Sequence, residues 1–363
     1  MTVTVADSSA TGADMRLKPA TVACGVFSVL ACMAFLLDPG VVPAWMRELP
    51  TSWRLGLDGW ISALMKWLFE TASFGLFTFK DATRAISQVL NAPLEIATAI
   101  LSAGIRDGRG SAAVQLAPPL PWVAVVGIVA ALGYRFGGAR LAMVAGGAFL
   151  YLAVFGQWAS AMTTLSSIVV AAPLGILLGL IAGVIGYRVP LFRKIIAPIL
   201  DLMQTVPTFA YLIPILFLFG FGPVAAMIAT IIYAAPPMVR VTIAALEAVP
   251  REIVEYGTMA GTTPRQMITK VMIPAARPQL LVGVNQVIML SLNMVIIASM
   301  IGAGGLGFDV LNSLRRLDIG RGLEAGVAIV VLAIALDRLS QAYAEGARRR
   351  DSQGGGRTFF LAM

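Results

Sequence analysis

The sequence predicts an all-α integral membrane protein. Hydrophobic residues make up 58% of the 363 residues and charged residues only 13%, which is more apolar surface than a soluble core of this size needs. The apolar residues gather in runs of about 17–25 residues, the length that crosses a bilayer as an α-helix. The candidate spans, about eight by this length criterion, cover residues 20–37, 118–134, 139–157, 162–187, 205–221, 222–246, 279–301 and 322–341.

The order of these runs predicts how the chain is organised. Residues 1–19 are polar and lack the apolar core and cleavage site of a secretory signal, so we expect a disordered cytoplasmic tail. A first transmembrane helix is expected over 20–37 and an extracytoplasmic or interfacial amphipathic region over 38–121. Two accessory transmembrane helices over 122–159 precede the core over 160–341, and a basic cytoplasmic tail covers 342–363.

The region over 38–121 fits the pattern of a span poorly. Apolar residues recur near helical spacing, but charged residues such as Lys66 and Glu70 interrupt them. Acidic and basic residues roughly balance, which favours amphipathic helices lying at the outer interface of the membrane. A single extra span over about 56–79 is the alternative, and it would change the side on which one terminus lies.

Basic residues predict the orientation of the chain. The formal net charge is +8, and an excess of Lys and Arg marks the cytoplasmic loops of membrane proteins. With eight spans, most basic loops fall on one side, so both termini are expected in the cytoplasm. Arg315, Arg316 and Arg321 fall on the other side as a local exception.

The sequence lacks the residues that several classes of function require. It contains no histidine, the commonest general base and metal ligand. Cys24 and Cys32 lie about 12 Å apart on one predicted helix, too far for a disulfide. Gly302–Gly307 matches G-x-G-x-x-G but follows a membrane helix, and no ATP-binding G-x-x-x-x-G-K-[ST] motif occurs. We therefore expect no catalytic residue, bound metal, cofactor or nucleic acid.

The segment Glu255–Pro274 is the most informative part of the sequence. It is polar and basic, and it lies between two strongly apolar runs. Its glutamate, a glycine six residues later and the Ile273–Pro274 pair predict two short helices that bend at Gly261, with the proline starting the return to the membrane. Such a knob could pass a push from a cytoplasmic partner to two spans. An ordinary solvated loop is the alternative.

Polar side chains within the apolar runs form a second candidate site. Such groups cost free energy in a membrane unless they face a cavity or another helix. They could line a pathway for a zwitterion, or they could join helices by hydrogen bonds. No acid–base pair is evident in the middle of the core spans, which argues against a proton-coupled carrier. The pathway candidates are Gln204, Thr205, Asn285, Gln286, Asn293 and Ser299.

The segment Glu255–Pro274 resembles the coupling loop of ABC-importer permeases, which follows the pattern E-A-A-x3-G-x9-I-x-L-P. Further blocks resemble the permease of the glycine betaine/proline (quaternary-amine) ABC importers, namely Asp201–Gly222, Gly283–Gly307 and Leu317–Leu339. The likeness covers about 160–341. It departs from the coupling pattern at Tyr256 and Gly257, which replace the two alanines, and at Val271 and Ile273, which replace the isoleucine and the leucine. The residues at the positions of the coupling pattern are Glu255, Gly257, Gly261, Val271, Ile273 and Pro274.

This resemblance implies an ABC type I importer permease fold with a coupling loop over 247–278. It implies a homodimer of permeases, two cytoplasmic ATP-binding subunits that hold ATP and Mg, and an extracytoplasmic substrate-binding protein. Glu255, Gly257, Gly261, Ile273 and Pro274 are the residues that it assigns to coupling with the ATPase. The resemblance also implies that the chain is a translocation subunit and not an enzyme, and that it lies in contact with lipid in a bacterial plasma (inner) membrane.

The function that follows is ATP-driven import of glycine betaine, proline or a related quaternary-amine compatible solute, with a role in osmoprotection. Choline, carnitine or another osmolyte is the alternative cargo. A secondary carrier driven by an ion gradient is a more distant alternative. It would need ionisable residues in the middle of the membrane or an inverted repeat, and neither is evident.

Overall fold

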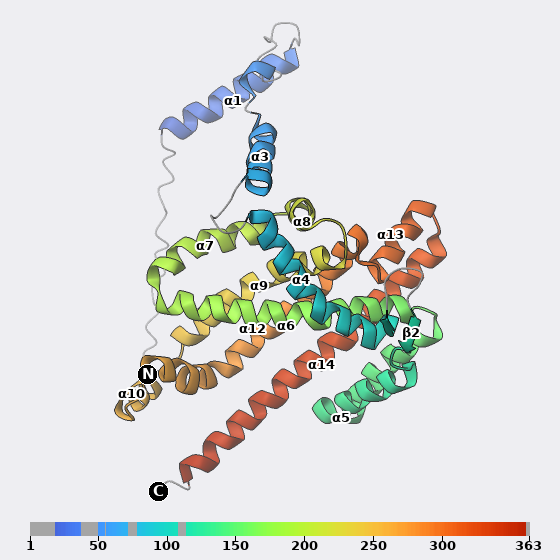
Figure 1. Cartoon of the computed structure of the whole chain (residues 1–363). Helices are drawn as coiled ribbons and strands as arrows, with labels where there is room; N and C mark the ends of the chain where they lie inside the picture. Colours follow the sequence, from blue (N-terminus) through green and yellow to red (C-terminus); the bar gives the residue numbers. More distant parts are fainter. Residues whose placement is uncertain (1–18, 38–49, 55, 72–77, 108–113, 361–363) are drawn as a thin grey trace, which may run out of the picture. The chain divides into compact units, whose positions relative to one another are not determined.

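The computed structural model describes residues 19–37, 50–54, 56–71, 78–107 and 114–360, and most of these described residues are helical (Figure 1). The predicted tail over 1–19 therefore lies outside the described residues, apart from its last residue. The chain divides into two units, Met1–Leu68 and Phe69–Met363. Elements of the first unit are α1 (Pro19–Leu37), the 3-10 turn η1 (Thr51–Trp53), α3 (Leu57–Lys66) and the start of the π-helical turn η2 (Trp67–Thr71).

The predicted all-α membrane fold is confirmed in the second unit. Among the described residues, six of its helical elements are long and apolar enough to cross a membrane, with the bent element α5 counted once, or seven if one bent pair counts as a span. The long helices are α4 (Phe79–Thr98) with η3 (Ala99–Ala103), α5 (Trp122–Val154), α6 (Trp158–Arg188), α9 (Pro223–Glu247), α12 (Ile273–Ala298) and α14 (Ile319–Phe360). The shorter elements between α9 and α14 are α10 (Arg251–Met259), α11 (Pro264–Gln266), η6 (Met267–Met272), η7 (Ser299–Ala303) and α13 (Leu306–Arg316).

The element α5 contains the two accessory helices that the sequence predicted within 122–159. Gly138 has a φ of 72° inside this element, a conformation that glycine adopts without strain. A Cβ on Gly133 would lie 2.9 Å from the Cα of Ala142, and a Cβ on Gly146 would lie 3.1 Å from the Cβ of Ala130. Residues this far apart in the sequence can touch only if the two arms pack antiparallel, so α5 is a helical hairpin.

The prediction of one continuous span over 205–221 is wrong. The structure has a broken helix there, in which α7 (Pro190–Thr205) is bent by 118° from the run of η5 (Thr208–Tyr211) and α8 (Leu212–Phe219). Proline disfavours the helical conformation of the residue before it, and Val206 is extended, with φ −66° and ψ 131°. The Val206–Pro207 pair therefore explains the break.

The helix α4 was not singled out by the sequence, because charged residues interrupt its apolar run. In the structure its face packs against α6, with Leu94 buried beside Val170 and Ala171. The hydroxyls of Thr98 and Ser166 lie 3.3 Å apart and hydrogen-bond between the same two helices. A short antiparallel pair of strands, β1 (Ile105–Asp107) and β2 (Val114–Ala117), follows. Of the alternative span over 56–79, residues 72–77 lie outside the described part of the chain.

The core lies where α6, α9 and α12 run side by side (Figure 1). Glycines on α6 let the backbones of α6 and α9 approach closely, as small residues do between membrane helices. A Cβ on Gly179 would lie 2.6 Å from the Cβ of Met238, and a Cβ on Gly183 would lie 2.4 Å from the Cβ of Thr242. No side chain larger than hydrogen fits at either glycine unless the helices move apart.

Candidate functional site

The segment between α9 and α12 folds as a compact knob, which we define as residues 248–272. The first short helix, α10, ends at Met259 with Ala260 as its cap, and Gly261 then adopts a φ of 71°. The Gly261 N–H donates to the Thr258 carbonyl at 3.0 Å, and the Thr262 N–H donates to the Gly257 carbonyl at 3.2 Å. These bonds satisfy carbonyls at the end of the helix, as a left-handed glycine commonly allows. The predicted bend at Gly261 is confirmed.

The second short helix of the knob has its own start signal. The Thr263 hydroxyl accepts from the Gln266 backbone N–H, and the Gln266 side chain accepts from the Thr263 N–H, which is a complete capping box. Pro264 occupies the first helical position, where its missing N–H is harmless. The return toward the membrane therefore begins at Pro264 and not, as predicted, at Pro274.

Pro274 lies within the continuous helical run Pro264–Ala303. Because proline has no N–H, it cannot donate to the carbonyl four residues earlier, at Lys270. The six residues before Ile273 form the π-helical stretch η6, and an extra residue in a helical turn is one way to accommodate such a missing bond. Ile273 and Pro274 thus lie where the knob passes into α12.

The knob is joined firmly to the membrane helices. Gly257 is buried, and a Cβ there would lie 2.8 Å from the Cε of Met267, so α10 packs directly on η6. Ile268 and Met272 belong to the same buried cluster as Leu246, near the end of α9. The side chain of Arg188, at the end of α6, donates to the Pro264 carbonyl. Displacing the knob would therefore displace the ends of three membrane helices.

One face of α10 presents apolar side chains to the outside. Ile253, Tyr256 and Met259 recur every three residues and so lie along one side of the helix, with exposed fractions of 36%, 75% and 78%. Glu255 is also exposed on α10. Large apolar side chains that gather on an exposed surface mark an interaction site, so this face could receive a partner.

Three of the six predicted pathway residues come together. Gln204 from α7 and the neighbours Asn285 and Gln286 from α12 line a cavity of about 510 Å³, with Arg240 and Pro237 from α9. Asn285 also accepts a hydrogen bond from the Ser340 hydroxyl of α14, at 2.8 Å. Asn285 therefore both lines the cavity and links α12 to α14 by a hydrogen bond.

The other three predicted pathway residues lie away from this cavity. The Thr205 hydroxyl donates to the Leu202 carbonyl on its own helix. Asn293 is exposed, seven residues after Gln286 on α12 and therefore on the same side of that helix. Ser299 is 1% exposed, and its hydroxyl donates to the Ile296 carbonyl at 2.7 Å.

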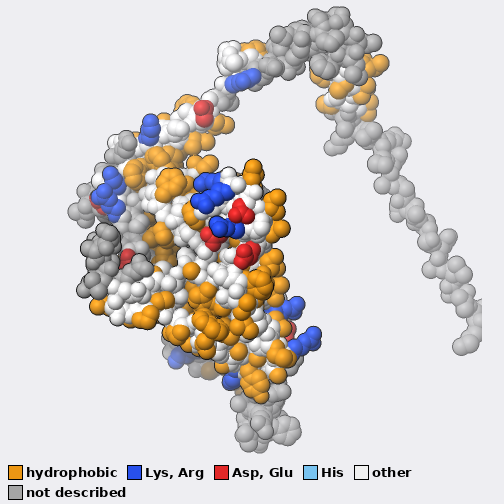
Figure 2. Space-filling model, turned by 90° about the vertical axis from the view of Figure 1, so that its right-hand side faces the viewer, with side chains coloured by type: hydrophobic (Ala, Val, Ile, Leu, Met, Phe, Trp, Pro, Cys, Tyr) orange, Lys and Arg blue, Asp and Glu red, His pale blue; other side chains and the backbone are white. Residues whose placement is uncertain are grey.

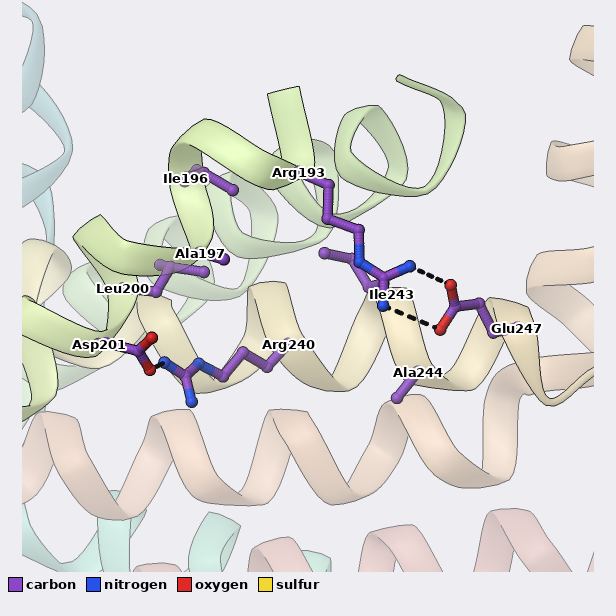
Figure 3. A pocket seen from close by; sticks show the side chains of 9 residues that line it. All are labelled: Arg193, Ile196, Ala197, Leu200, Asp201, Arg240, Ile243, Ala244 and Glu247. Atoms are coloured by element: carbon purple, nitrogen blue, oxygen red, sulfur yellow. Dashed lines mark hydrogen bonds and ion pairs between the residues drawn. The ribbon is translucent and has the colours of Figure 1, made fainter. Parts of the chain in front are cut away.

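Two ion pairs between α7 and α9 were missed by the sequence reading. Arg240 pairs with Asp201, and Arg193 pairs with Glu247, around a second cavity of about 290 Å³ (Figure 3). Arg193 and Asp201 precede the predicted span over 205–221 and Glu247 follows the one over 222–246, so the expectation that no acid–base pair lies in the middle of the core spans stays a prediction. Arg240 lies inside α9, seven residues before the end of that helix.

Among the described residues, no group of three or more His, Cys, Asp and Glu side chains is placed to hold a metal ion. The face in Figure 2 is largely covered by hydrophobic side chains, with charged side chains gathered in a few groups. Such a surface suits contact with lipid.

The sequence matches known proteins over the part that holds the knob and the two cavities. A family described as "Binding-protein-dependent transport system inner membrane component" matches residues 175–349, which include the knob and both cavities. Trimethylamine N-oxide transport system permease protein TmoV of Ruegeria pomeroyi is 39% identical over 341 residues, which cover 94% of this chain and 50% of TmoV. The chain thus spans half the length of that relative.

Two further relatives are matched over more of their own length. Glycine betaine/proline betaine transport system permease protein ProW of Escherichia coli is 42% identical over 239 residues, which cover 66% of this chain and 68% of ProW. Glycine betaine transport system permease protein OpuAB of Bacillus subtilis is 38% identical over 222 residues, which cover 61% of this chain and 79% of OpuAB.

Proposed function

The chain belongs to the family of binding-protein-dependent transport system inner membrane components, and we propose that it is the permease subunit of an ATP-driven importer for a small quaternary-amine or N-methylated solute. The proposal rests chiefly on the knob, a rigid exposed projection that is joined to the ends of α6, α9 and α12. The relatives are named as permeases of transport systems for glycine betaine, proline betaine or trimethylamine N-oxide, and these names support the class of cargo.

The proposed partners follow from what the chain lacks. It has no ATP-binding motif, so a separate ATPase would bind ATP and Mg and supply the energy. The exposed face of Ile253, Tyr256 and Met259 is the proposed contact with that ATPase. In the complete importer two copies of the permease would pair, each with one ATPase, and an extracytoplasmic binding protein would deliver the solute.

The proposed orientation puts the knob and both termini in the cytoplasm. Arg188, Arg193 and Lys194 lie around the junction of α6 and α7, and Arg251 and Arg265 lie on the knob. The contact between Arg188 and Pro264 brings these two basic segments to one end of the helices. A concentration of Lys and Arg at one end supports a cytoplasmic location for that end.

The proposed mechanism is alternating access. ATP-driven closure of the two ATPases would bring the knobs together, and the rigid packing of Gly257 against Met267 would carry the movement into α12. The helices would then open the path outward, the loaded binding protein would release its solute, and hydrolysis of ATP would reset the path. The permease would perform no covalent chemistry.

Uptake of labelled solutes tests the class of cargo. Cells that produce the chain with its partner subunits should take up glycine betaine, trimethylamine N-oxide or carnitine in a manner that depends on the chain, and the amide-lined cavity favours such uncharged or zwitterionic solutes. Cells without the chain, and competition with unlabelled choline and proline, are the controls. Uptake of choline alone would assign the cargo to a cation, and uptake of none of these solutes would contradict the proposed function.

A further inference from the structure

We propose that Arg240 and Asp201 form a transit site for a small zwitterion. In this site the Arg240 guanidinium binds the anionic oxygen of the solute, and the Asp201 carboxylate binds its alkylated ammonium group. The inference rests on the proposed function, because it names the chemistry by which the same pathway recognises its cargo.

The position of Arg240 is the first support. Arg240 projects from α9 and lines both cavities, the one of about 510 Å³ with Gln204, Asn285 and Gln286 and the one of about 290 Å³ with Asp201. The larger volume lies in the range of about 300–1,000 Å³ that is usual for small-molecule sites. A solute in the amide-lined cavity therefore lies beside one cationic side chain, that of Arg240. The Asp201 carboxylate forms an ion pair with this guanidinium (Figure 3).

The cost of opening the ion pair is the second support. The side chains of Arg240 and Asp201 are 42% and 67% exposed, and ion pairs this exposed add little to stability because water screens them. A zwitterion can replace each partner at the other, so opening the pair leaves neither charge without a partner. A plain cation such as choline would pair with Asp201 and leave Arg240 without an anion.

The lining of the cavities supports the assignment of the ammonium group to Asp201. Quaternary ammonium groups are often held over aromatic rings, but among the described residues that line the two cavities none is aromatic. Asp201 is the carboxylate paired with Arg240, which lines the larger cavity together with the amide side chains. Glu247 is paired with Arg193, and neither of these residues lines the larger cavity.

Transport by charge-neutral double variants tests the site. The permease with its ATPase and binding protein would be placed in vesicles, and uptake of labelled glycine betaine would be measured for the wild type and for Asp201→Asn with Arg240→Gln. This pair of changes leaves no unpaired charge, so a purely structural role predicts near-normal transport. We expect the maximal rate to fall roughly 10- to 100-fold, as for the loss of a hydrogen bond to a charged group, with basal ATPase activity and assembly retained.

The matched control is Arg193→Gln with Glu247→Gln, which removes the same two charges from the same two helices outside the amide-lined cavity. This control should keep transport within about threefold of the wild type, and Arg240→Lys should recover part of the rate because it keeps the charge without the planar fork. Equal losses in both double variants, or a normal rate in the Asp201/Arg240 variant, would overturn the inference alone. A wild type that carries no zwitterion would overturn the proposed function and the inference with it.

Discussion

Replacing Gly261 by proline is expected to reduce transport by about tenfold or more, while the chain still inserts into the membrane. Proline cannot adopt the φ of 71° that this position has, and it removes the N–H that donates to the Thr258 carbonyl. Each of these losses costs about 1 kcal/mol or more in the local fold. The knob would lose its bend, so the push of the ATPase would no longer reach the membrane helices. Uptake and stimulated ATP hydrolysis in vesicles measure the effect.

Gly261→Asn is the matched control for this prediction. A Cβ at Gly261 meets nothing within 4 Å, so the size of the new side chain is not the cause of the loss. Asparagine tolerates the left-handed conformation better than other residues with a side chain, and it keeps the N–H. It should therefore retain most of the transport. Wild-type transport by the proline variant would show that the bend plays no part in coupling.

Replacing Gly183 by leucine is expected to have the largest effect on stability. A Cβ at this position would lie 2.4 Å from the Cβ of Thr242 and 2.9 Å from the backbone carbonyl oxygen of Val239, so α6 and α9 would have to separate. Overpacking of this kind costs about 1–3 kcal/mol, which corresponds to a fall of roughly 1–4 °C in the melting temperature of a purified protein of this length.

Gly127→Leu provides the comparison. Gly127, like Gly183, lies in a helix. It is exposed, however, and a Cβ there meets nothing within 4 Å. Its melting temperature should stay close to that of the wild type, although both changes add the same side chain to a helical glycine. If the two variants melted together, the close contact between α6 and α9 would not be what holds the core.

The features that the sequence predicted well depend on local signals. The long helices follow from runs of apolar residues, and the bend of the knob follows from Gly261 and the residues that cap the two short helices. The hairpin in α5 was also predictable, because Arg135 and Arg140 separate two apolar runs and the glycine between them can adopt a positive φ. Each of these signals lies within a few residues of the structure that it determines.

The features that were missed depend on contacts between distant parts of the chain. The ion pair of Asp201 and Arg240 joins residues 39 positions apart, and a single sequence does not show that α7 bends back along α9. The apolar run over 205–221 favours one continuous helix, but the Val206–Pro207 pair interrupts the helix, and the structure has the break there. The charges on α4 hid a helix whose packing against α6 becomes visible only in the fold.

Site-directed cross-linking from the knob would test the central claim most directly. Cysteine would replace Met259 on the exposed face of α10 in a chain whose Cys24 and Cys32 had been changed to serine, and the protein would be purified from native membranes after cross-linking. We expect a nucleotide-binding ATPase to be captured at about one copy per permease. The control is a cysteine at Ile319, the first residue of α14, which α12 and α13 separate from the knob. This cysteine should capture no ATPase. A chain that purifies without any ATPase, even after cross-linking from Met259, would contradict the account and return the ion-driven carrier to consideration.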